Sequence, residues 1–166
     1  MSLFARSALL VIALSCGQTA LADDLADANA FMADLYRGYE GQGARPKRGD
    51  PRWYDESLSR LLSENEKANS DAVPYMSGDP LCNCMETFGL KVGGLKATRG
   101  EGGRFLGEAS LQFSGERVER IRLILVRTAG GLRVWDVADN EMSSLRQALA
   151  DDTASALKDK AESGRK

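Results

Sequence analysis

The fold is most evident from the segments FLGEASLQF (105–113) and IRLILVRTAGGLRVWDV (121–137). Apolar and polar residues alternate along the first segment, and a period of two is typical of a β-strand with one buried face. Glycines separate the apolar runs, and Gly130-Gly131 is a strong hairpin turn signal. We therefore predict antiparallel strands, joined by short turns, that bury one face and leave the other to solvent.

The same alternation assigns residues to the two faces of the predicted sheet. The apolar face should pack against helices, and it carries Phe105, Ala109, Leu111, Phe113, Ile121, Leu123 and Leu125. The wetter face carries Glu108, Ser110, Gln112, Arg120 and Arg122. A further strand is expected around 87–97, where Gly93-Gly94 weakens or bulges it. With the last strand over 132–137, the sheet has four strands.

Helical patterns flank the strands. Over 24–39 the apolar residues recur at intervals of three and four, which predicts a helix with one buried face. A second helix is expected to start at Asp50-Pro51, because Asp can accept from the free amides and Pro fits the first turn. After the last strand, Asn140 should cap a short helix over 142–149. This order predicts an α+β fold, with N-terminal helices packed on a curved antiparallel four-strand meander and a short C-terminal helix.

The first 22 residues have the organisation of an export signal. Arg6 is their only charged residue, an apolar stretch covers 8–14, and Ala20-Leu21-Ala22 offers the small-residue pattern that signal peptidase cleaves. The apolar stretch is too short to cross about 30 Å of hydrocarbon as a helix. We predict cleavage after Ala22 and a periplasmic or secreted protein. A lipoprotein signal at Cys16 is the weaker alternative, because it lacks the leucine usually found three residues earlier.

The remaining sequence divides into one domain and a tail. We predict a signal peptide over 1–22, a single α+β domain over 23–150 and a polar C-terminal tail over 151–166, where apolar residues are few. No other stretch is long and apolar enough for a membrane span in the mature chain. The sequence leaves the oligomeric state open.

Composition excludes several classes of function. Lys plus Arg is 22 and Asp plus Glu is 24, so the net charge is −2, without the basic excess of a nucleic-acid surface. The chain has no histidine, which removes Ser-His-Asp triads, Cys-His dyads and His-ligated zinc. No motif for a cofactor is present, and none is expected.

Two cysteines stay in the mature chain, as Cys82-Asn83-Cys84. Disulfides persist in an oxidising compartment, and a left-handed turn at Asn83 would let the two sulfurs meet. We interpret the pair first as a structural disulfide. Free or interchain thiols are a second interpretation, and a redox or metal role is a third. No metal site is predicted, because two thiolates without histidine lack partner ligands.

Three segments resemble a bacterial family called domain of unknown function 3828, whose members are similar to nuclear transport factor 2-like cones. They are the aromatic positions of the first helix, DPLCNCME over 79–86, and GGLRVWDV with SLRQAL over 130–149. Met85 and Glu86 stand where the family usually has Gln-Asp, and Leu132 and Trp135 also depart from its pattern. The resemblance implies an exported, cone-shaped fold of the nuclear transport factor 2-like or cystatin-like kind. It implies no activity.

The resemblance also suggests where a pocket would lie. Ketosteroid isomerases and limonene epoxide hydrolases, which share the cone, place Asp and Tyr inside it. The matching candidates for a pocket or partner-binding site are Tyr36, Tyr39, Asp79, Glu86, Trp135 and Asp136. A structural interpretation is stronger for two of them: Asp79 precedes a proline and should fix a turn, and Asp136 should cap an element or pair with an arginine.

Five strand arginines have two interpretations. They are Arg104, Arg120, Arg122, Arg127 and Arg133. They could form a basic patch for an acidic partner. Because Glu101, Glu108, Glu116 and Glu119 lie among them, cross-strand ion pairs on a solvated face are the preferred interpretation.

The functional hypothesis is an exported, non-enzymatic binding protein of the immunity or inhibitor type, with a protein partner or a small apolar ligand. The alternative is a small pocket enzyme of the ketosteroid-isomerase or epoxide-hydrolase type that uses Asp and Tyr. A cone filled with side chains would favour surface binding, and an open apolar cavity around a carboxylate would favour the enzyme.

Overall fold

A computed structural model describes residues 16–70, 75, 78–113 and 118–163, with side chains from residue 23 onward. Most of the predicted export signal, the predicted short turn after the strand 105–113, and Glu116 therefore lie outside the described residues. The elements are α1 (Cys16–Arg37), the 3-10 helix η1 (Gly38–Glu40), α2 (Glu56–Ala68), β1 (Lys91–Arg99), the 3-10 helix η2 (Glu101–Gly103), β2 (Phe105–Gln112), β3 (Val118–Thr128), β4 (Gly131–Ala138) and α3 (Leu145–Ser163).

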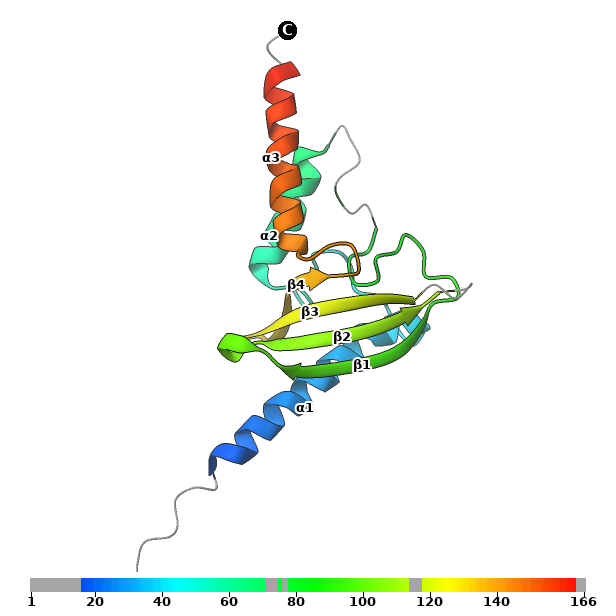
Figure 1. Ribbon diagram of the computed structural model, residues 1–166, viewed down its shortest axis with the longest axis vertical. Helices are drawn as coiled ribbons and strands as arrows, with labels where there is room; N and C mark the ends of the chain where they lie inside the picture. Colours follow the sequence, from blue (N-terminus) through cyan, green and yellow to red (C-terminus); the bar gives the residue numbers. More distant parts are fainter. Residues whose placement is uncertain (1–15, 71–74, 76–77, 114–117, 164–166) are drawn as a thin grey trace, which may run out of the picture.

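Four antiparallel strands form one meander in the order β1-β2-β3-β4, and helices lie on either side of them in the chain (Figure 1). Helix α1 runs across one face of the sheet, over β1 and β2, while α2 and α3 lie side by side next to β4 (Figure 1). The predicted α+β fold is confirmed. None of the helices in the described part of the chain has the length and apolar character that crossing a membrane requires.

The predicted assignment of the sheet faces is also confirmed. Along β2 and β3 the residues alternate between buried and more exposed positions, with Leu123 fully buried and Arg122 exposed. Helix α1 covers the buried face so closely that a Cβ atom at Gly107 would lie 2.6 Å from the Met32 sulfur. The interior beside β2 is therefore filled by a side chain of α1.

The first strand has the irregularity that its glycines predicted. The pairing of β1 with β2 shifts between Val92 and Gly94, so Gly93 is the extra residue of a bulge. Because Gly93 has no Cβ atom, the backbone can bend at this residue without a steric clash.

The second helix starts five residues later than predicted. Asp50 instead holds a turn in which its carboxylate accepts hydrogen bonds from the main chain and side chain of Arg52. Asp55 is the N-cap, and its carboxylate accepts the amides of Ser57 and Leu58. The residues between these two aspartates are held away from a helix because Tyr54 forms a parallel bridge to Val134 and so extends the sheet past β4.

The last helix is longer than predicted and starts differently. Ser144, not Asn140, accepts the Gln147 amide at its first turn. The helix continues to Ser163, through most of the segment predicted as a polar tail. This extension packs on α2, where Asp152 accepts hydrogen bonds of 2.7 and 2.8 Å from the amide groups of Asn65 and Asn69. The periodicity of apolar residues did not reveal the contact because polar side chains make it.

Candidate functional site

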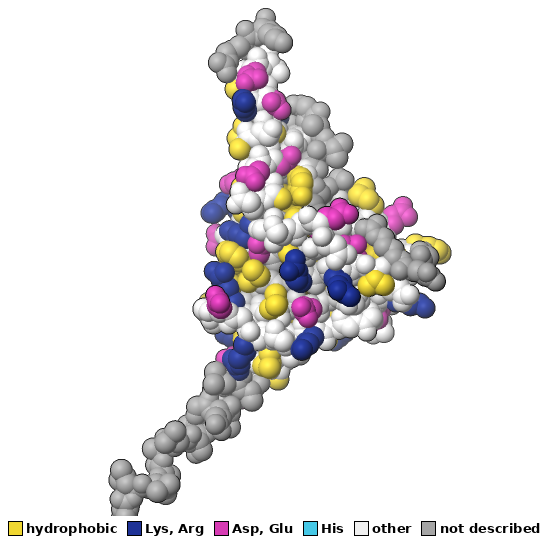
Figure 2. Space-filling model, viewed as in Figure 1, with side chains coloured by type: hydrophobic (Ala, Val, Ile, Leu, Met, Phe, Trp, Pro, Cys, Tyr) yellow, Lys and Arg dark blue, Asp and Glu magenta, His cyan; other side chains and the backbone are white. Residues whose placement is uncertain are grey.

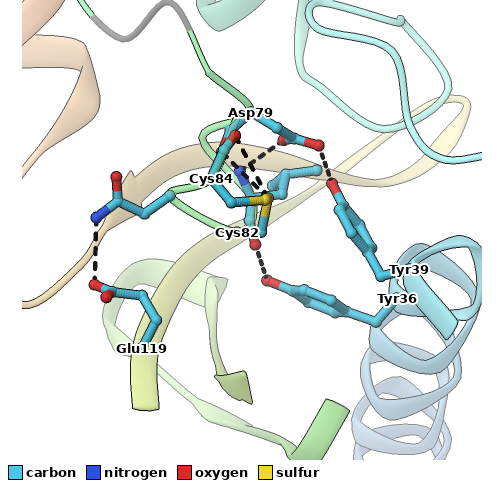
Figure 3. The surroundings of a disulfide bond; sticks show 8 residues. Tyr36, Tyr39, Asp79, Cys82, Cys84 and Glu119 are labelled. Atoms are coloured by element: carbon cyan, nitrogen blue, oxygen red, sulfur yellow. Dashed lines mark hydrogen bonds between the residues drawn. A yellow bond between two sulfur atoms is a disulfide. The ribbon is translucent and has the colours of Figure 1, made fainter. Parts of the chain in front are cut away.

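The candidate site is built around the disulfide loop, residues 79–84 (Figure 3). Cys82 and Cys84 are joined by a disulfide, and their Cα atoms lie 5.2 Å apart. Asn83 between them has φ 48°, the left-handed conformation that the sequence predicted for this residue. The structural disulfide is confirmed. It fits an oxidising, extracytoplasmic environment.

Asp79 organises the loop with its main chain and its side chain. Its amide donates to the Cys84 carbonyl at 2.8 Å, and its carboxylate oxygen Oδ1 accepts the Leu81 amide at 2.9 Å. The turn expected from Asp79-Pro80 is therefore present. Gly78 lets the two ends of the loop approach, because a Cβ atom there would lie 2.6 Å from the Cys84 carbonyl oxygen.

Side chains from three elements, α1, η1 and β3, hold the loop (Figure 3). From α1, the Tyr36 hydroxyl donates to the Leu81 carbonyl at 2.9 Å. From η1, the Tyr39 hydroxyl donates to Asp79 Oδ2 at 2.5 Å. From β3, Glu119 accepts a hydrogen bond of 3.3 Å from the Asn83 side chain. Tyr36, Tyr39 and Glu119 are all buried, so the loop is part of the folded core.

Burial dominates the electrostatics of this cluster. It raises the pKa of Asp79 above 3.8, although the hydrogen bonds from Tyr39 and the Leu81 amide, and the nearby Arg45 and Arg48, act in the opposite direction. Burial and the Asp79 charge also raise the pKa values of Tyr36 and Tyr39. The tyrosines therefore stay protonated and act only as hydrogen-bond donors.

The structure brings together three of the predicted site residues, namely Tyr36, Tyr39 and Asp79. Both Asp79 oxygens accept hydrogen bonds from the chain itself. Tyr54 lies in the same buried region, where the Asp79 charge contributes to raising its pKa. Its hydroxyl has no hydrogen-bond partner among the described residues. The arrangement suits a structural anchor, and Asp79 with its raised pKa is the group that comes nearest to an acid–base function.

Trp135 and Asp136 belong to a different place, the junction of β4 with α3. Asp136 is 6% exposed, and its carboxylate accepts the Val137 and Arg146 amides and the Ser144 hydroxyl. The predicted capping by Asp136 is confirmed. The guanidinium groups of Arg104 and Arg146 both lie over the Trp135 ring, at 4.1 and 4.5 Å from its centre. Trp135 and Asp136 both contact Arg146 of α3, and they thereby fix this helix on the sheet.

Glu86 lies apart from the buried cluster, on the exposed segment that follows the disulfide loop. Its neighbours form what we call the apolar tip, Met85 and Phe88, which are 73% and 87% exposed. Sequence reasoning missed this tip. The strand predicted around 87–97 hid it, because that range includes Phe88, whereas β1 begins only at Lys91.

Comparisons of the chain with protein-family models, curated proteins and solved structures found no match. The function of the site is therefore inferred from its geometry.

The buried Asp79 carboxylate gives a pH-dependent prediction. The unfolded chain ionises this carboxyl near pH 3.8, while burial keeps the folded form protonated to a higher pH. Below pH 3.8 the carboxyl is protonated in both states, and its contribution to folding stability is fully present. This contribution is lost as the pH rises from the unfolded pKa through the higher pKa of the folded state. Asp79→Asn removes the titration. We expect the stability of the variant relative to wild type to increase between about pH 3 and about pH 7, measured by urea unfolding. A difference that stays constant, or that decreases, would contradict a buried charge at this position.

Proposed function

We propose that this is an exported, non-enzymatic binding protein of the immunity or inhibitor type, which contacts a protein partner through its apolar tip. The observation that carries the proposal is the exposure of Met85 and Phe88 next to a loop that is fixed on three sides. A large aromatic side chain on a rigid support is typical of an interface anchor, because little conformational entropy is lost when it binds.

The rigidity of the support comes from contacts already described. The disulfide closes the loop two residues before Glu86, and hydrogen bonds from Tyr36, Tyr39 and Asn83 hold it on the core. Glu86, one of the predicted partner-binding residues, lies between the two tip residues and is exposed. A disulfide in this position also supports the proposed export, since such bonds persist outside the reducing cytosol.

The roles of the candidate carboxylates support binding over catalysis. Asp79 and Asp136 accept hydrogen bonds from the chain at both carboxylate oxygens. A general base needs an oxygen directed at the substrate. The order of elements and the filled interior beside Gly107 also fit the cone-type resemblance, in a form that binds at its surface.

One observation favours the pocket enzyme as a second candidate. Asp79 has a raised pKa and lies in a buried group with Tyr36, Tyr39 and Tyr54, and the Tyr54 hydroxyl lacks a partner among the described residues. Opening of this cluster would expose a carboxyl group and three phenol groups to a small ligand, the combination that proton-transfer enzymes use.

Site-specific photo-crosslinking tests the proposed function. A photoreactive phenylalanine analogue at position 88 should give one discrete adduct band when the protein is made in its own cells and irradiated. The matched control places the same analogue at Leu157, another exposed apolar residue, on α3. We expect no discrete adduct from position 157.

The outcome discriminates between the two candidates. Loss of the adduct when Met85→Ser is combined with the position-88 analogue would confirm that the apolar tip makes the contact. Equal labelling from positions 88 and 157, or no labelling from either, would contradict a partner at the tip. If neither position is labelled, the pocket enzyme becomes the better candidate.

A further inference from the structure

The face of the sheet opposite α1, which we call the outer sheet face, carries an excess of positive charge. Cross-strand pairing places Lys96 opposite Glu108, and Glu108 opposite Arg122, so these three side chains share this face. The next pairs along the strands add Arg120 beside Ser110, and Lys91 beside Gln112. Four cations and one carboxylate therefore face solvent here, in a chain whose net charge is −2.

Three of the five strand arginines are used within the fold. Arg127 pairs with Asp24 and Asp27 of α1, Arg104 stacks on Trp135, and Arg133 donates to the Pro51 carbonyl. The cross-strand ion pairs that the sequence favoured account for none of these contacts. Glu119, one of the expected acidic partners, is buried and accepts a hydrogen bond from Asn83.

Two arginines are left for an external partner. Within the residues that the structure describes, Arg120 makes no hydrogen bond or ion pair. Arg122 makes a single long hydrogen bond of 3.5 Å, to the main-chain oxygen of Asp139. Figure 2 views this face of the sheet and shows several Lys and Arg side chains spread over the strands. The charge is therefore available at the surface.

A hollow of about 620 Å³ opens between these arginines. Its polar lining comes from β2, from β3 and from the segment after β4, and it consists of Glu108, Ser110, Arg120, Arg122, Asp139 and Asn140. The Asp139 carboxylate is buried and is already used within the fold, where it accepts the amides of Glu141 and Met142. This volume is within the range of a binding site. The lining offers guanidinium, hydroxyl and amide donors, which are the groups that recognise carboxylates.

We propose that the outer sheet face binds an acidic segment of the partner protein. The inference rests on the proposed binding function and adds the chemistry of the partner. Cations on β1 and β3 are separated by two strand spacings, about 10 Å, and Lys91 and Lys96 lie about 16 Å apart along β1. One small anion cannot span that area, whereas a peptide with several carboxylates can. A flat layer of anionic lipid would leave the hollow empty, while acidic side chains can enter it.

The surface extends the apolar tip. Phe88 is three residues from Lys91, where β1 begins, and Lys91 shares a row with Val118, which is 49% exposed. One partner can therefore bury its apolar residues on the tip and place its carboxylates on the outer sheet face. Charge would then speed association and select the partner, while the tip would supply the buried anchor.

The test uses the purified mature protein and a fluorescent polyglutamate peptide as the probe. We expect saturable binding that weakens as salt is added. Arg120→Glu with Arg122→Glu should weaken it about tenfold or more, because like charges then face each other. The matched control is Arg60→Glu with Lys158→Glu, two exposed cations on α2 and α3 that change the net charge equally. It should change the affinity by less than about twofold.

Five results would overturn the inference, four of which concern the peptide and the vesicles. These four are no binding of polyglutamate, equal weakening by both double variants, an unchanged affinity in Arg120→Glu with Arg122→Glu, and tighter binding to phosphatidylglycerol vesicles than to the peptide. Inorganic phosphate that competes as well as the peptide would indicate a small-anion site and would also contradict it. Crosslinking from position 88 reports separately on the proposed function. If position 88 gives an adduct but one of these results is also obtained, the proposed binding function stands and only the proposal of an acidic partner is rejected.

Discussion

Leu123→Ala is expected to lower the free energy of unfolding by about 2–5 kcal/mol. Leu123 is fully buried at the centre of β3, where it faces α1 from beside Gly107. The substitution removes apolar contacts and leaves a cavity, because the sheet and helix cannot close around a single missing side chain. A small domain has a total stability of roughly 5–15 kcal/mol, so the loss is a large fraction of it. Urea unfolding followed by circular dichroism measures the change.

Arg122→Ala is the matched control for this substitution. It lies on the same strand, one residue away, and points to the outer sheet face. We expect a loss of about 0.5 kcal/mol or less, because only one long hydrogen bond is removed from an exposed position. Equal losses for the two variants would show that the assignment of the faces is wrong.

Asp136→Ala is expected to cost about 2–4 kcal/mol, the second-largest effect. Its buried carboxylate accepts two main-chain amides and the Ser144 hydroxyl. Alanine leaves these donors without an acceptor in a position that water reaches poorly, and the start of α3 loses its connection to β4. The variant should unfold at a lower urea concentration, and the fluorescence of Trp135, the neighbouring residue, should report the same transition.

The control for Asp136 is Asp151→Ala. Asp151 is exposed on α3 and accepts one hydrogen bond, of 2.8 Å, from Gln147 four residues earlier. We expect a cost of about 0.5 kcal/mol or less. If Asp136→Ala lowers the free energy of unfolding no more than Asp151→Ala does, the Asp136 carboxylate does not anchor the helix and becomes a candidate for a functional role.

The sheet could be predicted because its information is local. The alternation in β2 and β3, the Gly130-Gly131 turn and the glycines of the β1 bulge each act on their near neighbours along the chain. The disulfide was predictable for the same reason, since only one residue separates the two cysteines. Asp79 was predicted to fix a turn, and it does.

The parts that were missed depend on contacts between distant segments. Nothing near Tyr54 indicates that it will pair with Val134, and that pairing moves the start of α2 from Asp50 to Asp55. The α3 extension is helical because Asp152 meets Asn65 and Asn69 of α2, a polar contact without a hydrophobic period. The arginines could not be assigned from sequence either, because their partners come from other elements.

The pairing of Tyr54 with β4 has a consequence for the order in which the chain folds. The segment before α2 finds a partner 82 residues later, as the Arg133–Pro51 hydrogen bond shows. The first turn of α2 does the same through the Arg146–Ser57 hydrogen bond, across 89 residues. During synthesis from the N-terminus, α1 and α2 are complete long before β4 exists. Helix α1 can pack on β1 and β2 once these are made, but α2 packs on β4 and α3, so its apolar face stays uncovered until the last quarter of the chain has been made. Contacts of such long range slow folding. A truncation that removes β4 and α3 should therefore yield an aggregating fragment rather than a smaller domain.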